Sequence, residues 1–190
     1  MITAETAWWR TAGPENIWGL DGDGITGCLG AILPAIPERG TVLDLGCGPG
    51  RLLTPLHQMG PDLRLIGLDV RDYGDAWEPG VEWHVGDGRN IPAGVGWLDG
   101  AYSIALFQHL PHAATCWYLR QVADRLRPGA RIVFQHVLGD EDSFLSHQID
   151  LETLDGLCSQ AGLTVETMAV GVLHHQWVWV TAHATGGSTR

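Results

Sequence analysis

Short runs of apolar and β-branched residues alternate along the chain with longer runs in which apolar positions recur at helical spacing. Glycine, proline and aspartate separate the runs, as is typical of mostly parallel sheets whose strands are joined by helices. This pattern predicts seven strands, at Thr41–Leu45, Leu63–Leu68, Val81–Val85, Gly100–Phe107, Arg131–Val137, Thr164–Val170 and Gln176–His183.

Helices are predicted between most of these strands. One follows Pro49, one covers Ala114–Leu126 before the stop signal Arg127-Pro128-Gly129, and one covers Leu151–Ala161 before Gly162. Too few residues separate the last two strands for a helix, so we expect them to pair antiparallel. The expected fold class is α/β, with a doubly wound, mostly parallel seven-stranded sheet, a C-terminal antiparallel hairpin and helices on both faces.

A chain of 190 residues fits one domain. We expect that domain over residues 1–185, with a core at 41–183 and a helical segment at 1–40 in front of it. Residues 186–190 are expected to form a flexible tail.

The charge of the chain excludes several classes of protein. It carries 22 Asp and Glu residues against 11 basic residues, all of them arginine, for a net charge of −11. Without lysine, the chain can neither form a Schiff base nor complete the phosphate loop G-x-x-x-x-G-K-[ST]. The acidic balance argues against nucleic acid as a partner, because such binding depends on basic residues that neutralise phosphates.

Cysteine spacing and hydropathy indicate the compartment. The four cysteines are far apart, and the longest apolar stretch, residues 24–37, is broken by glycine and proline. We therefore expect free thiols, a cytoplasmic location and no membrane span.

The strongest chemical signal is a buried strand that runs into a glycine-rich turn, in the segment Val42–Arg51. Glycines let the backbone turn tightly and lie against a ligand. The following helix, with Pro49 as its expected first residue, would offer N–H groups to an anion. Arg51 stands where the dinucleotide fingerprint has its third glycine, which counts against NAD or FAD.

Further motifs follow in order. Asp44 precedes Gly46, Gly48 and Gly50, and two later strands end close to Asp69 and Asp87. A fourth strand with its exit loop, residues 98–110, and a turn into a fifth strand, residues 126–134, complete the series. Aspartate also favours turns on its own, but three at strand ends beside one crevice favour a binding site. In order and spacing, about residues 40–183 resemble the class I S-adenosylmethionine-dependent methyltransferases of the small-molecule type, which have a Rossmann-like sheet.

The resemblance implies S-adenosylmethionine as the cofactor and S-adenosylhomocysteine as the product. Asp44 and the glycine loop would hold the methionine part, Asp69 the ribose hydroxyls, and Asp87 with apolar neighbours the adenine. Cys47 is expected to fill the loop with a small side chain rather than to act as a nucleophile. The implied cofactor-binding set is Asp44, Gly46, Cys47, Gly48, Gly50, Asp69, Val70, Asp87, Gly88 and Phe107.

Two histidines are candidates for catalysis. Methyl transfer is an in-line displacement that needs alignment and exclusion of water, and needs a base only if the acceptor must lose a proton. His109, which follows the fourth strand, is the first candidate for that base and His112 the second, with packing at the strand end as the alternative. Pro111 argues against a helix that presents both to a metal, and no acidic pair accompanies them, so no metal is expected.

The N-terminal segment carries Trp8, Trp9 and Trp18. In the family such a segment often folds over the cofactor as a lid, and packing in the core is the alternative. A short lid suits a small-molecule acceptor with an O, N or S nucleophile. Two other functions stay open: a catalytically inactive methyltransferase-like scaffold and, less favoured, a dinucleotide-dependent oxidoreductase. A monomer and a homodimer fit the sequence equally.

Overall fold

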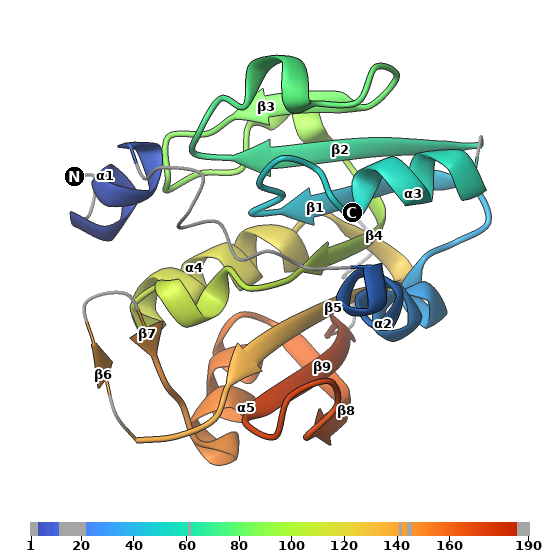
Figure 1. Ribbon diagram of the computed structural model, residues 1–190. Helices are drawn as coiled ribbons and strands as arrows, with labels where there is room; N and C mark the ends of the chain where they lie inside the picture. The colour runs from blue at the N-terminus through green and yellow to red at the C-terminus, as the bar shows by residue number, and fades with distance from the viewer. Residues whose placement is uncertain (1–3, 12–21, 61, 141, 144–145, 186–190) are drawn as a thin grey trace.

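The computed structural model of the chain describes residues 4–11, 22–60, 62–140, 142–143 and 146–185 (Figure 1). The expected tail at 186–190 and Trp18 lie outside these ranges. Within them, no helix combines the length and apolar character that crossing a bilayer requires.

A seven-stranded sheet forms the centre of the molecule, in the order β3-β2-β1-β4-β5-β9-β8. Its strands are β1 (Gly40–Leu45), β2 (Leu63–Asp69), β3 (Glu82–Val85), β4 (Leu98–Ser103), β5 (Leu126–Val137), β8 (Leu163–Val170) and β9 (Trp177–Ala184). The first five are parallel, and β9 lies antiparallel between β5 and β8. The predicted fold class, with its closing antiparallel hairpin, is confirmed.

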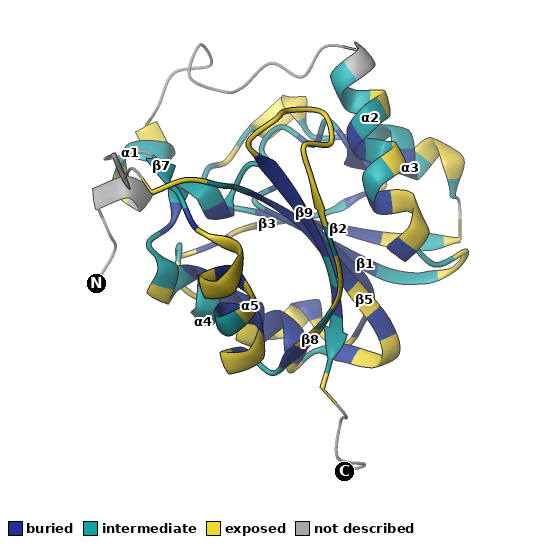
Figure 2. Ribbon diagram, turned by 90° about the horizontal axis from the view of Figure 1, so that it is seen from below, coloured by how far each residue is buried: buried dark blue, intermediate teal, exposed yellow. Residues whose placement is uncertain are grey.

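Helices cover both faces of this sheet (Figure 2). One face carries α2 (Gly22–Ile32) and α3 (Leu53–Met59), and the other carries α4 (His112–Ala123) and α5 (Leu151–Gln160). A small hairpin of β6 (Asp142–Ser143) and β7 (Ser146–His147) stands beside α4 and α5, and α1 (Ala4–Thr11) lies beyond the carboxyl ends of β1 and β2 (Figure 1).

Side chains alternate between the two faces along each strand, which divides the core into two layers. On β5, Ile132 and Phe134 pack in the layer under α4 and α5, whereas Val133 between them packs in the layer under α2 and α3. Each face of the central strands is therefore apolar, as the continuous hydrophobic runs predict for a parallel sheet covered on both sides.

Several predicted boundaries were wrong, among them the start of the fifth strand, which is Leu126 rather than Arg131. At two others, local backbone geometry overrides the hydrophobic pattern. Strand β4 ends at Ser103 rather than at Phe107, since Ala105 has a φ of +55°, which an extended strand does not accommodate. Helix α3 begins at Leu53 rather than at Pro49. This start places Pro55 in the first turn, where its missing N–H breaks no helical hydrogen bond.

The N-terminal segment expected to be a lid divides into two parts. Helix α2 belongs to the core, because Cys28 and Ile32 on it are fully buried against Val42 of β1 and Tyr102 of β4. Of the two described helices of this segment, α1 lies at the carboxyl ends of the strands, where Arg10 Nη2 donates to the carbonyl of Gly86 at 3.1 Å.

Candidate functional site

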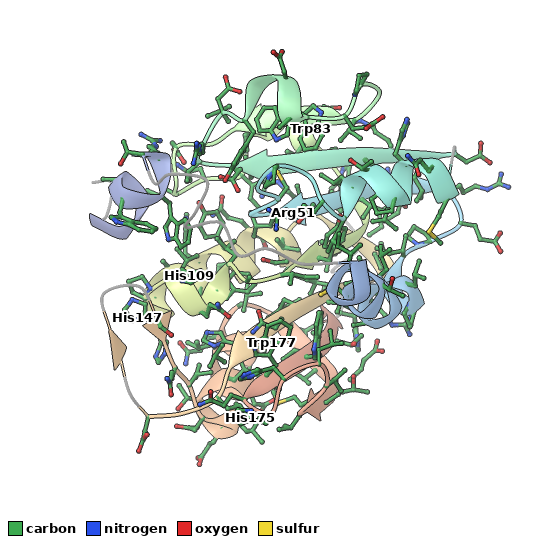
Figure 3. All side chains as sticks on the ribbon, viewed as in Figure 1. Arg51, Trp83, His109, His147, His175 and Trp177 are labelled. Atoms are coloured by element: carbon green, nitrogen blue, oxygen red, sulfur yellow. The ribbon has the colours of Figure 1, made fainter. Side chains whose placement is uncertain are left out.

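A cavity opens at the carboxyl ends of β1 to β4, where the order of the strands reverses between β1 and β4. At such a point, the connections after the two neighbouring strands run to opposite faces of the sheet, and a crevice forms between them. The walls are the glycine loop after β1, the exits of β2 and β3, residues 104–106, 109 and 110 after β4, Tyr118 of α4 and Trp9 of α1. Figure 3 labels Arg51 and His109, which line the cavity from the two sides of this reversal.

The three glycines of the loop are required for different reasons. Gly46, Gly48 and Gly50 all have positive φ, at +78°, +54° and +84°. A Cβ on Gly50 would lie 2.4 Å from the ring of Trp83, whereas one on Gly48 would meet only the Tyr73 hydroxyl, at 3.9 Å. Packing therefore demands glycine at position 50, and at position 48 glycine leaves bare backbone facing the cavity.

Aromatic residues after β2 hold this loop from outside. Trp77 Nε1 donates to the carbonyl of Gly48 at 3.0 Å, and the Trp77 ring stacks on Trp83 at 4.8 Å with parallel planes. Tyr73 from the same segment lines the cavity. The sequence analysis did not identify these three residues, although the density of aromatic residues between Tyr73 and Trp83 was a usable signal.

Asp69 ends β2 with its carboxylate at the cavity. Its Oδ2 accepts a hydrogen bond from the N–H of Gly48 at 2.8 Å, and its Oδ1 accepts one from Arg71 N–H at 3.0 Å. Burial raises the pKa of this carboxyl, and these backbone donors oppose the rise. The carboxylate thus joins the second strand to the glycine loop and keeps acceptor capacity for a ligand, since each oxygen can accept more than one bond.

Asp44 is the buried acidic group of the site, with 4% of its surface exposed. It pairs in register with Tyr102 on β4, so the two side chains flank the reversal of strand order. Burial raises the pKa of Asp44 to about 8, and the negative charge of Asp69 adds to the rise. A cation in the cavity would favour the charged form of this carboxyl.

Cys47 lies between these groups and lines the cavity. Burial raises the pKa of its thiol, and the charges of Asp44 and Asp69 raise it further. Its Sγ donates to the carbonyl of Gly48 at 3.5 Å. A thiol in such surroundings stays protonated and is a poor nucleophile.

At the exit of β3, Asp87 does not line the cavity, although its neighbours in the sequence do. Asp87 Oδ1 accepts from the N–H groups of Arg89 and Asn90 at 2.8 and 2.7 Å, and its Oδ2 accepts from Asn90 Nδ2 at 2.8 Å. The bonds from Asn90 are the main cause of its lowered pKa. Gly86, Gly88 and Asn90 line the cavity, whereas Asp87 is exposed and shapes the turn that carries them.

Of two other residues in the implied cofactor-binding set, Val70 lines the cavity and Phe107 does not. Val70 directly follows Asp69 at the end of β2. Phe107 is fully buried in the core, where its ring packs edge-to-face against Phe134 at 5.2 Å. Ala105 and Leu106 line the cavity in its place, because the chain turns after β4 instead of continuing as a strand.

The two candidate catalytic histidines differ in their access to the cavity. His109 lines the cavity, and the ring of Trp9 lies over it at 4.7 Å between centroids. His112, at the start of α4, pairs its Nε2 with the carbonyl oxygen of Gln148 at 3.1 Å and is not among the lining residues. Of the two, only His109 has access to a molecule in the cavity.

Over the described ranges, no three histidine, cysteine or acidic side chains come together as a metal site. His174 and His175 lie in the turn between β8 and β9, with ring centroids 4.3 Å apart.

Comparison with known proteins places this geometry in context. A family described as "Methyltransferase domain" matches residues 42–129, which contain the glycine loop, Asp69 and His109. An O-methyltransferase, cnsE, of Penicillium expansum is 27% identical over 83% of this chain, and a trans-aconitate 2-methyltransferase of Azoarcus sp. (strain BH72) is 33% identical over 64% of it. The chain spans 64% and 49% of the length of these two relatives.

Solved structures share the fold at low identity. The CcbJ methyltransferase from Streptomyces caelestis superimposes with a TM-score of 0.72 at 16% identity, covering 90% of this chain and 94% of that one. Magnesium protoporphyrin IX methyltransferase from Synechocystis PCC 6803, with bound SAM, gives a TM-score of 0.71 at 14% identity, covering 95% and 97%.

The buried carboxyl of Asp44 predicts how stability depends on pH. An unfolded aspartate loses its proton near pH 3.9, whereas folded Asp44 keeps it up to about pH 8. The unfolded state then binds fewer protons between these values, so this group lowers the free energy of unfolding as pH rises. Asp44→Asn, neutral at every pH, should therefore gain stability relative to wild type between about pH 5 and pH 8. Urea unfolding across that range measures the difference, and a constant difference contradicts the assignment.

The position of Phe107 predicts a packing role. Phe107→Leu should lower the free energy of unfolding by about 1–2 kcal/mol, because it replaces a fully buried ring with a smaller side chain. The affinity of the folded variant for any ligand of the cavity should change less than about threefold, since Phe107 does not line it. Urea unfolding and calorimetric titration measure the two effects, and a large loss of affinity at normal stability contradicts this role.

Proposed function

We propose that the chain is a class I S-adenosylmethionine-dependent methyltransferase and that it transfers the methyl group of S-adenosylmethionine to a small-molecule acceptor, releasing S-adenosylhomocysteine. One observation carries the proposal. The glycine loop, two strand-end carboxyl groups and a histidine, which lie far apart in the sequence, line one cavity at the reversal of strand order.

The residues of the cavity fit the cofactor on their own chemistry. Bare backbone at Gly48 and the buried carboxyl of Asp44 suit an amino-acid group, whose ammonium would favour the ionised form of that carboxyl. Asp69, an acceptor at the adjacent strand end, suits the two ribose hydroxyls. Val70 and Gly88 would flank the adenine, with Asn90 supplying polar contacts in the place expected for Asp87.

The cofactor, when bound, supplies a methyl group already activated by a sulfonium, so the protein has to align the acceptor and exclude water. Trp9, Leu106 and Leu110 make the wall on the His109 side largely apolar. We assign this side to the acceptor and α1 to the part of the lid that covers it. Arg10 holds α1 in place through its bond to Gly86.

His109 would accept the proton that a hydroxyl acceptor loses. An imidazole titrates near neutral pH, which suits a general base. The relative from Penicillium expansum is named an O-methyltransferase, and we therefore favour an oxygen nucleophile over nitrogen or sulfur. The Trp9 ring over His109 would keep bulk water from competing for the proton.

Cofactor binding tests the proposal directly. Asp69→Ala should weaken S-adenosylhomocysteine binding by about 1–3 kcal/mol, or about 5- to 150-fold, because charge-assisted hydrogen bonds are lost. Isothermal titration calorimetry measures the change. Asp155→Ala, which removes an exposed carboxylate on α5, is the matched control and should bind like wild type. No binding of S-adenosylhomocysteine by folded wild-type protein would overturn the function, and normal binding by Asp69→Ala would remove Asp69 from the site.

Turnover tests the role of His109. His109→Gln should reduce kcat by about 10²–10⁴-fold with a hydroxyl acceptor, while the Kd for S-adenosylhomocysteine changes little. Release of S-adenosylhomocysteine in a screen of small hydroxyl, amine and thiol compounds identifies an acceptor and gives the rate. His175→Gln, in the exposed turn after β8, serves as the control. A rate within about tenfold of wild type at every pH rules out the base, but leaves the methyltransferase assignment in place.

A further inference from the structure

A chain of side-chain hydrogen bonds runs from the middle of the sheet to His109. Gln135 of β5 has no exposed surface. Its Oε1 accepts from the N–H of Ala105 at 3.0 Å, and its Nε2 donates to Gln108 Oε1 at 3.0 Å. Gln108 Nε2 in turn lies 3.3 Å from Nε2 of His109.

The direction of every bond in this chain is fixed at its buried end. A backbone N–H can only donate, so the atom of Gln135 that faces Ala105 must be its oxygen. The other end of the Gln135 amide is then a donor, and the atom of Gln108 that receives its bond must be an oxygen. Gln108 therefore presents an N–H to His109, and the ring nitrogen that accepts it, Nε2, must carry a lone pair.

The same glutamine also holds a strained stretch of backbone. Ala105 has a φ of +55°, which is unfavourable for a residue with a Cβ. Ala105 lines the cavity between β4 and His109. By binding its N–H, Gln135 fixes the turn that brings residues 105–109 to the acceptor side.

We propose that Gln135 and Gln108 are positioning residues for His109, and that they define Nε2 as the nitrogen that accepts the proton of the acceptor. This inference rests on the proposed function. The neutral ring carries its hydrogen on Nδ1 and offers the Nε2 lone pair, which Gln108 occupies until the hydroxyl of an acceptor takes its place. When Nε2 has received the proton, it faces the amide N–H of Gln108, and this like polarity favours return to the neutral base.

Other titratable groups surround the chain of bonds. His112 of α4, His136 of β5 and His147 of β7 lie close enough for their charges to interact. His136 is fully buried, and burial lowers its pKa to about 4, so it is neutral at the pH of the experiment. Asp44 and Asp69 lie elsewhere on the cavity wall. None of these groups is altered in the variants below, so their influence is common to all samples.

The test measures which ring nitrogen of His109 is protonated, and it does not require turnover. Nitrogen-15 NMR of the full chain, with the His109 signals assigned from their loss in His109→Gln, distinguishes protonated from unprotonated ring nitrogens. In wild type above pH 8, Nε2 of His109 should be unprotonated and Nδ1 protonated. The opposite tautomer overturns the proposal.

A variant that reverses the polarity of the bond between Gln108 and His109 provides a more discriminating test. In Gln108→Glu, a carboxylate can accept both from Gln135 Nε2 and from the ring, so the hydrogen should move to Nε2 and the titration midpoint of His109 should rise by about 1 pH unit or more. The acidic limb of the kcat profile should move to higher pH by the same amount. Gln108→Met, of similar size but without polar atoms, should leave a mixture of tautomers. Unchanged nitrogen shifts in both variants overturn the proposal.

Gln135→Met tests the buried end of the chain. The population of the Nδ1–H tautomer should fall even though Gln108 and His109 are intact, because nothing then orients the amide of Gln108. Circular dichroism and S-adenosylhomocysteine binding check that the variant folds, and the Gln108 variants decide the matter if it does not. Failure of the proposed function would appear as absent cofactor binding in wild type, whereas failure of this inference would appear only in the nitrogen shifts and the pH profile.

Discussion

The reversal of strand order between β1 and β4 is the constraint on which the site depends. β2 and β3 extend the sheet on one side of β1, and β4 and β5 extend it on the other. The connections leaving β1 and β4 therefore run to opposite faces, and neither covers the gap between them. Asp44 and Tyr102 pair in register across these two strands, and both are buried by the sheet, but Asp44 also lines the cavity. The glycine loop and His109 reach the same space because they lie in the segments that follow these two strands.

This arrangement places two carboxyl groups where burial disfavours their charged form. Burial raises the pKa of both Asp44 and Asp69, and at Asp69 backbone hydrogen bonds and the charge of Arg71 oppose the rise. The chain keeps these groups at some cost to stability, as is common for residues that serve binding rather than folding.

Much of the fold could be predicted from sequence because its signals are local. Alternating apolar runs defined the strands, and the order of glycine and aspartate motifs indicated the methyltransferase resemblance and most of the residues that line the cavity at β1 and β2. The errors have one physical origin in contacts between distant segments. The turn at Ala105 depends on Gln135, thirty residues away, so no local pattern showed that β4 would end early and direct Leu106 rather than Phe107 to the cavity. Likewise, Asp87 was identified correctly as a strand-end acid, but its bonds to Asn90 became visible only in three dimensions.

The packing of Trp83 has a consequence for how relatives of this chain diverge. Its indole fills the space left by two glycines, Gly50 in the loop and Gly67 in β2, where added Cβ atoms would lie 2.4 and 2.5 Å from the ring. A larger residue at position 67 requires a smaller residue at position 83, whereas at position 50 the φ of +84° disfavours a side chain even when space is available. Substitutions at these positions are therefore sterically linked, and the glycine loop is constrained by the side chain that the third strand packs against it.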